Sequence, residues 1–323
     1  MLEQNNEVWR GIHQVSVVIP LYNEEENLRE LHHRLKKIFK ENQLNYEIIF
    51  VDDGSQDNSL AVIKEICRSD TKCRYVSFSR NFGHEAASTA GLERARGEVA
   101  ILMDADLQDP PEFIPTLIKK WQEGYEVVYA RRKKRRGESL FKQITSWLFY
   151  RLLNLFSEIK IPEDVGDFRL MDRKILEEFK KLPERNRFVR GLIAWLGYRQ
   201  TSVEYERPER YKGKTKYNPF QLTYLAFDAL TSFSTSLLRI STFSGFIVAF
   251  VSFLIVLIIF CQKVFFRLPI PGYALIATGL FFLGGLILIY LGLVGEYIAK
   301  IHRQVQERPL YIVKEEKDGE DSL

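Results

Sequence analysis

The chain has 323 residues, of which 46% are hydrophobic and 27% are charged, and its formal net charge is +4. That length allows one large domain or two small ones, and the composition is ordinary for a packed globule. The three cysteines are odd in number and lack the spacing of metal ligands, which argues against a disulfide framework or a zinc site and suits a reducing cytoplasm.

Charge is distributed unevenly along the chain. Charged residues are spread through the first 240 positions and almost vanish between Phe243 and Tyr297, so we predict a soluble part followed by a membrane part. The amino-terminal residues lack an apolar core of signal-peptide length, and we expect the first domain to stay on the side where it is made. The basic run 131–136 is typical of contact with nucleic acid or anionic lipid, or of a solvated loop.

Short β-branched runs alternate with stretches of helical spacing in the first 103 residues. The predicted strands are 15–20, 46–51, 75–78 and 99–103. One predicted helix begins within 23–27, and two others cover 60–67 and 85–95. This alternation predicts an α/β fold with a mostly parallel sheet covered on both faces. Ligands of such sheets bind at the carboxyl ends of the strands, where the acidic turns of this sequence fall.

Two amphipathic stretches follow, at 138–160 and 219–238. Either stretch suits a core-facing helix of the globule, but the aromatic content favours a helix lying in a bilayer interface. Residues 243–266 and 273–298 are each long and apolar enough to cross a bilayer, so we predict a two-helix transmembrane hairpin with both flanks on one side. The charged tail, 314–323, is predicted to be disordered.

The segment ILMDADLQDPPEF, residues 101–113, places Asp104 and Asp106 directly after an apolar strand. Two like charges so close should repel each other, unless a bound cation neutralises them. Gln108 adds a neutral oxygen donor, and oxygen ligands of this kind suit Mg²⁺ or Mn²⁺. The sequence therefore predicts a divalent-cation site at this strand end.

The chain has no G-x-G-x-x-G after its first strand and no G-x-x-x-x-G-K-[ST], which disfavours a dinucleotide oxidoreductase and a P-loop NTPase. Phosphate would then be bound by the metal and by basic side chains. The candidates for that contact are Arg131, Arg136, Arg169, Arg210 and Lys216.

Taken together, the motifs resemble the membrane-bound polyisoprenyl-phosphate glycosyltransferases, relatives of dolichol-phosphate mannose synthase within the GT-A inverting family 2. The resemblance rests on VVIPLYNEEENL, VDDGSQDNS, SRNFGHEAA, DADLQDPPE, VGDFRLMDR, RFVRGLIAWLGY and RYKGKTKYN, and on the two apolar segments. It implies a GT-A catalytic domain with a Rossmann-like sheet, interfacial amphipathic helices and a carboxy-terminal transmembrane hairpin. Thr215 stands where many relatives carry Ser.

The resemblance also implies the roles of particular residues. Those implied to line the nucleotide sugar are Pro20, Tyr22, Asn23, Glu24, Asp52, Asp53, Asp104 and Ala105. Those implied to meet phosphates are Arg131, Arg136, Arg210 and Lys216. Asp106, also a catalytic candidate, and Gln108 would hold Mg²⁺ or Mn²⁺.

The implied reaction transfers a hexose, with glucose from UDP-glucose preferred, to a polyprenyl phosphate such as undecaprenyl phosphate, with inversion. Asp167 would orient or deprotonate the acceptor, and Arg169 would bind phosphate or orient Asp167, although a structural ion pair between these two residues stays open. Because a phosphate monoester is already largely ionised at neutral pH, a strong general base is optional. GDP-mannose, UDP-N-acetylglucosamine and aminoarabinose donors remain alternatives.

The expected organisation is a cytoplasmic catalytic domain at 1–218, an interfacial helix at 219–240, two transmembrane helices within 241–299 and a cytoplasmic tail at 300–323. We expect a multi-pass protein of a bacterial inner membrane that binds lipid and a nucleotide sugar, self-associates and does not bind nucleic acid. A processive polysaccharide synthase is disfavoured because its Q-x-x-R-W signature is absent, and a non-catalytic membrane scaffold because the motifs are intact. The scattered histidines, including His84, are interpreted as structural or surface residues.

Overall fold

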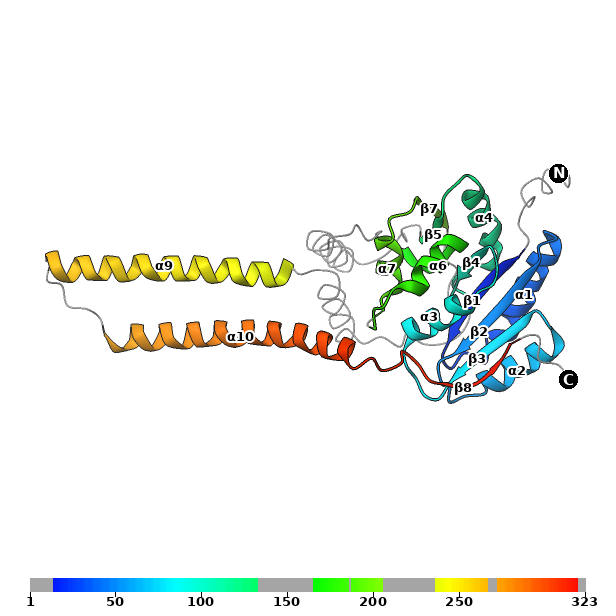
Figure 1. Cartoon of the computed structure of the whole chain (residues 1–323), viewed down its shortest axis with the longest axis horizontal. Helices are drawn as coiled ribbons and strands as arrows, with labels where there is room; N and C mark the ends of the chain where they lie inside the picture. The colour runs from blue at the N-terminus through cyan, green and yellow to red at the C-terminus, as the bar shows by residue number, and fades with distance from the viewer. Residues whose placement is uncertain (1–13, 133–164, 186, 206–235, 267–271, 319–323) are drawn as a thin grey trace. The chain divides into compact units, whose positions relative to one another are not determined.

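The protein is represented by a computed structural model that describes residues 14–132, 165–185, 187–205, 236–266 and 272–318 (Figure 1). The chain divides into a sheet unit, residues 1–150, 159–218 and 308–323, and a helical unit, residues 151–158 and 219–307. The amphipathic helix predicted at 138–160, and most of the one predicted at 219–238, lie outside the described residues.

The sheet unit contains an eight-stranded sheet among its described residues, in the order β7-β5-β6-β4-β1-β2-β3-β8. The strands are β1 (Val15–Leu21), β2 (Tyr46–Asp52), β3 (Cys73–Phe78), β4 (Val99–Leu102), β5 (Val127–Arg132), β6 (Val165–Asp172), β7 (Gln200–Tyr205) and β8 (Val313–Lys317). The pairs β1–β2, β1–β4, β2–β3 and β5–β7 are parallel, whereas β6 and β8 pair antiparallel with their neighbours. The predicted α/β fold with a mostly parallel sheet is confirmed.

Helices cover both faces of this sheet (Figure 1). They are α1 (Leu28–Glu41), α2 (Ser59–Ser69), α3 (His84–Arg94), the short 3-10 helix η1 (Pro111–Phe113), α4 (Ile114–Gln122), α6 (Arg173–Lys181) and α7 (Val189–Trp195). α1, α2 and α4 enclose the larger core, and α3, α6 and α7 contact one another on the opposite face. α3 lies very close to the sheet because it is built from small residues: a Cβ on Gly91 would lie 2.2 Å from Cγ1 of Val18.

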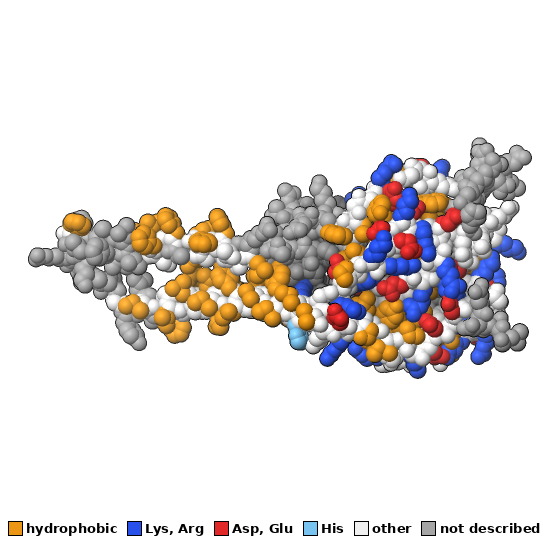
Figure 2. Space-filling model, viewed as in Figure 1, with side chains coloured by type: hydrophobic (Ala, Val, Ile, Leu, Met, Phe, Trp, Pro, Cys, Tyr) orange, Lys and Arg blue, Asp and Glu red, His pale blue; other side chains and the backbone are white. Residues whose placement is uncertain are grey.

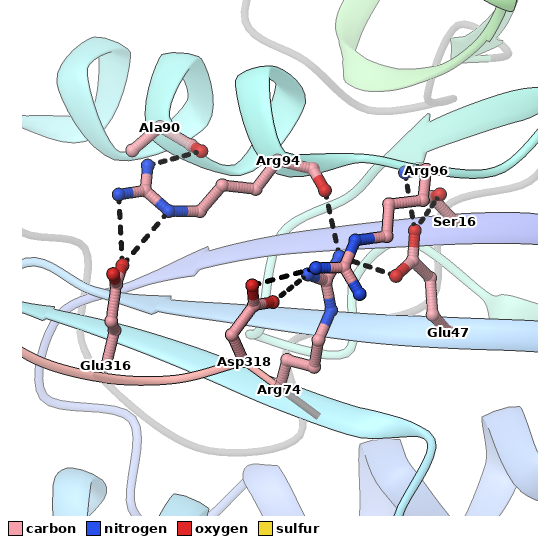
Figure 3. Close-up of polar contacts among 8 residues, drawn as sticks. All are labelled: Ser16, Glu47, Arg74, Ala90, Arg94, Arg96, Glu316 and Asp318. Carbon is pink, nitrogen blue, oxygen red and sulfur yellow. Dashed lines mark hydrogen bonds and ion pairs between the residues drawn. The ribbon is translucent and has the colours of Figure 1, made fainter. Parts of the chain in front are cut away.

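The disorder predicted for the tail is wrong for residues 314–317, which belong to β8 (Val313–Lys317) at the edge of the sheet beside β3. Arg74 on β3 explains the docking, because its buried guanidinium bridges Glu47 on β2 and Asp318 just after β8 (Figure 3). Arg94 reaches Glu316 on β8 from the end of α3 (Nη2 to Oε2, 3.1 Å). The charges that made this tail look unstructured are thus its binding contacts.

The helical unit contains α9 (Ser236–Phe266) and α10 (Tyr273–Val305), joined by a hydrogen bond between the hydroxyls of Ser244 and Tyr290. Hydrophobic side chains cover these helices, whereas charged side chains cover the sheet unit (Figure 2). Among the described residues one helical stretch, Gly279–Val305, has the length and apolarity needed to cross a membrane. The apolar stretch found within α9, Ser241–Ile255, is shorter, so the predicted pair of spans is not supported beyond one.

Candidate active site

Eight of the predicted site residues lie at the carboxyl ends of three neighbouring strands. β1, β2 and β4 are parallel, and Leu21 is in register with Asp52, so the segments that follow them emerge at one edge of the sheet. These residues are Pro20, Tyr22, Asn23 and Glu24 at the end of β1, Asp52 and Asp53 at the end of β2, and Asp104 and Ala105 after β4. The fold therefore groups the positions predicted to line a nucleotide sugar.

The segments after β1 and β2 are held together by hydrogen bonds. Asp52 accepts from the backbone N–H of Ser55 (3.0 Å) and from the hydroxyl of Ser77 (2.7 Å), which orients its carboxylate. Asn23 adopts φ +56°, a left-handed conformation that asparagine tolerates better than most residues. Its backbone N–H donates to the Ser55 hydroxyl (3.0 Å), and its Oδ1 accepts from the N–H of Gln56 (2.8 Å).

The loop after β3 packs on the turn after β2. The carboxylate of Asp53 accepts hydrogen bonds from the backbone N–H groups of Phe82 (2.6 Å) and Gly83 (2.9 Å). Burial raises the pKa of Asp53, and these two bonds oppose that rise. Gly54 between the two loops has φ +69°, and a Cβ there would lie 2.5 Å from the carbonyl carbon of Arg80, so the turn requires glycine.

The turn after β4 is built around buried carboxylates. Asp106 is 7% exposed, and its Oδ1 accepts the backbone N–H of Gln108 (3.1 Å). Asp109 is fully buried and accepts a hydrogen bond from the hydroxyl of Tyr205 (2.8 Å). It also lies 3.4 Å from the backbone nitrogen of Asp104, so it fixes the conformation of the turn. The carboxylate of Asp106 and the carboxamide of Gln108 are hard oxygen donors, and their chemistry fits Mg²⁺ or Mn²⁺.

Asp167 on β6 faces the same cluster. Its carboxylate binds Arg190 on α7 at both oxygens, with Nε to Oδ1 at 2.7 Å and Nη2 to Oδ2 at 2.6 Å. Burial alone would raise the pKa of Asp167, but Arg190 and then His84 hold that pKa well below its usual range. A carboxylate with a lowered pKa and a bidentate arginine is suited to orienting other groups and is a weak proton acceptor.

Arg169 is completely buried beneath this carboxylate. Its guanidinium donates to the carbonyl oxygens of Gly166 (3.0 Å) and Asp167 (3.2 Å) and lies 5.1 Å from the centre of the Tyr129 ring. Burial lowers its pKa. With no exposed surface, Arg169 is placed to orient Asp167 rather than to meet a phosphate directly.

Sequence reasoning gave no site role to two residues of this cluster, His84 and Arg190. His84, interpreted from the sequence as structural or surface, lies in the cluster itself: its Nε2 is 3.3 Å from Oδ2 of Asp167 and 3.8 Å from Oδ1 of Asp104. Both residues lie in quoted motifs, SRNFGHEAA and RFVRGLIAWLGY. The available signal was the place of His84 after the third strand, at the edge where the acidic turns gather.

Of the four residues that the resemblance implies for phosphate contacts, the structure describes one. Arg131 lies on β5, half-buried, in register with Val165 of β6 and Glu204 of β7. Arg136, Arg210 and Lys216 lie outside the described residues. Their roles, like those of the nucleotide and metal ligands, stay predictions.

Residues 16–180 match the protein family described as glycosyl transferase family 2. The chain is 46% identical over 301 residues to the uncharacterized glycosyltransferase YkcC of Bacillus subtilis (strain 168), covering 93% of each chain. It is 42% identical over 305 residues to the bactoprenol glucosyl transferase of Shigella phage SfII, covering 94% of this chain and 99% of the relative.

The fold is also similar to solved structures. The crystal structure of M. tuberculosis glucosyl-3-phosphoglycerate synthase superposes with a TM-score of 0.50 at 18% identity, covering 72% of this chain and 82% of that one. At this identity the likeness shows the fold alone. It agrees with the GT-A-like sheet described above.

Proposed function

We propose that this chain, which belongs to glycosyl transferase family 2, transfers glucose from UDP-glucose to a polyprenyl phosphate such as undecaprenyl phosphate. The observation that carries the proposal is the 42% identity to a bactoprenol glucosyl transferase along 99% of that relative, including the segments after α7. Similarity over the full length supports a shared acceptor class as well as a shared fold. The carboxylate-rich strand ends supply the site.

The donor would lie across the ends of β1, β2 and β4. Hydrogen bonds between the loops orient Asn23 and Asp53, and Ser55 and Ser77 orient Asp52, which supports the assignment of these three residues to the base and ribose. Asp106 and Gln108 would hold Mg²⁺ or Mn²⁺. When bound, the cation supplies positive charge for the diphosphate of the donor. Arg131, Arg136, Arg210 and Lys216 are proposed for the remaining phosphate contacts.

In the proposed reaction an oxygen of the acceptor phosphate attacks the anomeric carbon of the glucose. The new carbon–oxygen bond forms as the bond from that carbon to the β-phosphate oxygen breaks, and the electron pair leaves with UDP. A phosphate monoester has a second pKa near ~6, so at neutral pH the nucleophile is largely a dianion and no proton has to be removed. Asp167, held by Arg190, would orient the acceptor, and direct displacement of an α-linked donor gives a β-linked product.

A polyprenyl acceptor requires access to a bilayer. The apolar stretch Gly279–Val305 in α10 can cross one, and we propose that α9 completes a hairpin in a bacterial inner membrane with the sheet unit in the cytoplasm. Self-association through these helices is part of the proposal.

The test is mass spectrometry of lipids after incubating purified full-length protein with undecaprenyl phosphate, Mg²⁺ or Mn²⁺, and one nucleotide sugar at a time. UDP-glucose should give a lipid heavier by one hexose, and Asp106→Ala should lose it. A product from GDP-mannose, UDP-N-acetylglucosamine or an aminoarabinose donor alone would refute the assignment of glucose. A ladder of several added hexoses would refute single transfer in favour of a processive synthase.

A further inference from the structure

Two carboxylates of the site come from neighbouring elements: Asp104 follows β4, and Asp167 lies on β6, the antiparallel neighbour of β4. The pairing of β4 with β6 ends at Leu102 and Arg169, Asp104 follows two residues later, and carboxylate oxygens of Asp104 and Asp167 lie within 4.8 Å of each other. Like charges directly opposite each other on neighbouring strands destabilise a sheet. Burial and the nearby Asp167 raise the pKa of Asp104, and a positive charge between the two carboxylates would relieve this repulsion.

His84 supplies that charge from a third element, the first residue of α3. Its Nε2 is buried, makes no hydrogen bond of good geometry and lies within ion-pair distance of both carboxylates, 3.3 Å from Asp167 and 3.8 Å from Asp104. Gly83, with φ +100°, turns the chain immediately before the helix and aims the imidazole at the pair. Burial disfavours the charged imidazole, but the two carboxylates outweigh it and raise the pKa of His84 to about 10.

The other charges around this group are consistent with an imidazolium. The carboxylates of Asp53 and Glu85 also interact electrostatically with His84. The carboxylate of Glu85 accepts a hydrogen bond from the backbone N–H of Val189 (2.8 Å). Asp167 already has Arg190 and Arg169 on its remaining sides. A divalent cation bound to His84 would sit against two guanidinium groups, whereas a proton on the imidazole fits without adding a second positive charge.

We propose that His84 is a positioning residue that holds Asp104, on the donor side of the site, and Asp167, on the acceptor side, at a fixed separation. The proposal rests on the proposed function, because it assumes that donor and acceptor meet between these strands. Without the imidazolium the two carboxylates repel and separate, and the acceptor loses its alignment with the donor. The effect falls more on turnover than on donor binding, since Asn23 and Asp52 are oriented by hydrogen bonds to Ser55 and Ser77 rather than by His84.

The test compares His84→Gln, His84→Lys and His32→Gln in purified full-length protein. A misplacement of about 1 Å costs roughly 10²-fold in rate, so His84→Gln should lower kcat by about that factor and change the KM for UDP-glucose less than ~3-fold. His84→Lys should recover at least roughly tenfold of the loss, because a lysine restores the charge but cannot replace a histidine ligand to a metal. His32→Gln is the matched control: it removes a part-buried His–Asp contact, 3.0 Å to Asp70, near the amino ends of β2 and β3 rather than the carboxyl ends that form the site, and it should keep the wild-type kcat.

A kcat for His84→Gln within threefold of wild type, or no recovery by His84→Lys, would overturn the proposal. A second readout does not depend on the substrates: nitrogen NMR of histidine-labelled protein at pH 8, with His84 assigned by its loss in His84→Gln. The imidazole should carry protons on both nitrogens, and a neutral His84 would overturn the proposal even if no donor reacts. Absence of product from wild type with a protonated His84 would instead refute the proposed function alone.

Discussion

We predict that replacing Arg74, which contacts both the sheet and the tail, lowers the free energy of unfolding. Its side chain is 7% exposed and donates to Glu47 (Nη2 to Oε2, 2.5 Å), to Asp318 and to the carbonyl of Arg94 (2.8 Å) (Figure 3). Replacing Arg74 by Met keeps most of the apolar stem but leaves the Glu47 carboxylate, 6% exposed, without its cation.

Removing one partner of a buried ion pair costs about 3–5 kcal/mol. Glu47 keeps two donors, the hydroxyl of Ser16 (2.5 Å) and the backbone N–H of Arg96 (2.7 Å), which offset part of that loss. We therefore expect Arg74→Met to lower the free energy of unfolding by about 2–3 kcal/mol. For a unit of this size, that corresponds to a fall in Tm of roughly 5–10 °C.

The assay is thermal unfolding of the purified protein followed by circular dichroism. Asp318→Asn is the matched control, because Asp318 contacts the same guanidinium but is 53% exposed, and such surface pairs contribute only about 0–1 kcal/mol. Its Tm should fall by less than about 3 °C. If Arg74→Met lowered the Tm no more than Asp318→Asn, the buried ion pair with Glu47 would not be the main contribution of Arg74 to stability.

Three further outcomes follow from the site. The kcat/KM should fall as the pH drops below about 6, because the acceptor phosphate gains a proton there. Since the pKa of Asp167 lies below its usual range, Asp167→Asn should show the same fall in kcat/KM at low pH. Loss of that fall in the variant would show that Asp167 is the group that titrates. Gly54→Ala should lower the free energy of unfolding by about 1–3 kcal/mol through backbone strain, and calorimetry should show weaker UDP binding. Gly284→Ala places its new methyl group where nothing lies within 4 Å, and it should change neither quantity. Chelation should abolish product formation reversibly in wild type, and activity that survives EDTA would exclude a required cation.

The predicted fold came from local patterns, and these were sufficient where strands are apolar and consecutive. β1 to β4 lie within two residues of their predicted bounds because β-branched runs and acidic turns mark them. β8 could not be found this way. Its sequence, VKEEK, is mostly charged, and its pairing with β3 joins positions more than 230 residues apart, so no local pattern carries the signal.

The site was predictable in its members and less so in their partners. In the sequence, Asp104 has Asp106 as its like-charged neighbour two residues away, and this spacing predicts a cation that neutralises both. In the structure Asp104 lies close to Asp167 as well, and the imidazole of His84 lies within 3.8 Å of Asp104. That relation depends on the antiparallel register of β4 and β6 and on where α3 begins, which are tertiary facts that spacing along the chain does not contain.

The central claim is that one glucose is transferred to the phosphate oxygen of a polyprenyl monophosphate. The most direct measurement is the tandem mass spectrum of the lipid formed from UDP-glucose carrying isotope-labelled glucose and undecaprenyl phosphate. We expect a single labelled hexose attached to a lipid that contains one phosphorus atom, with UDP as the second product. A lipid diphosphate released together with UMP would mean that sugar phosphate rather than sugar is transferred, and would contradict the claim.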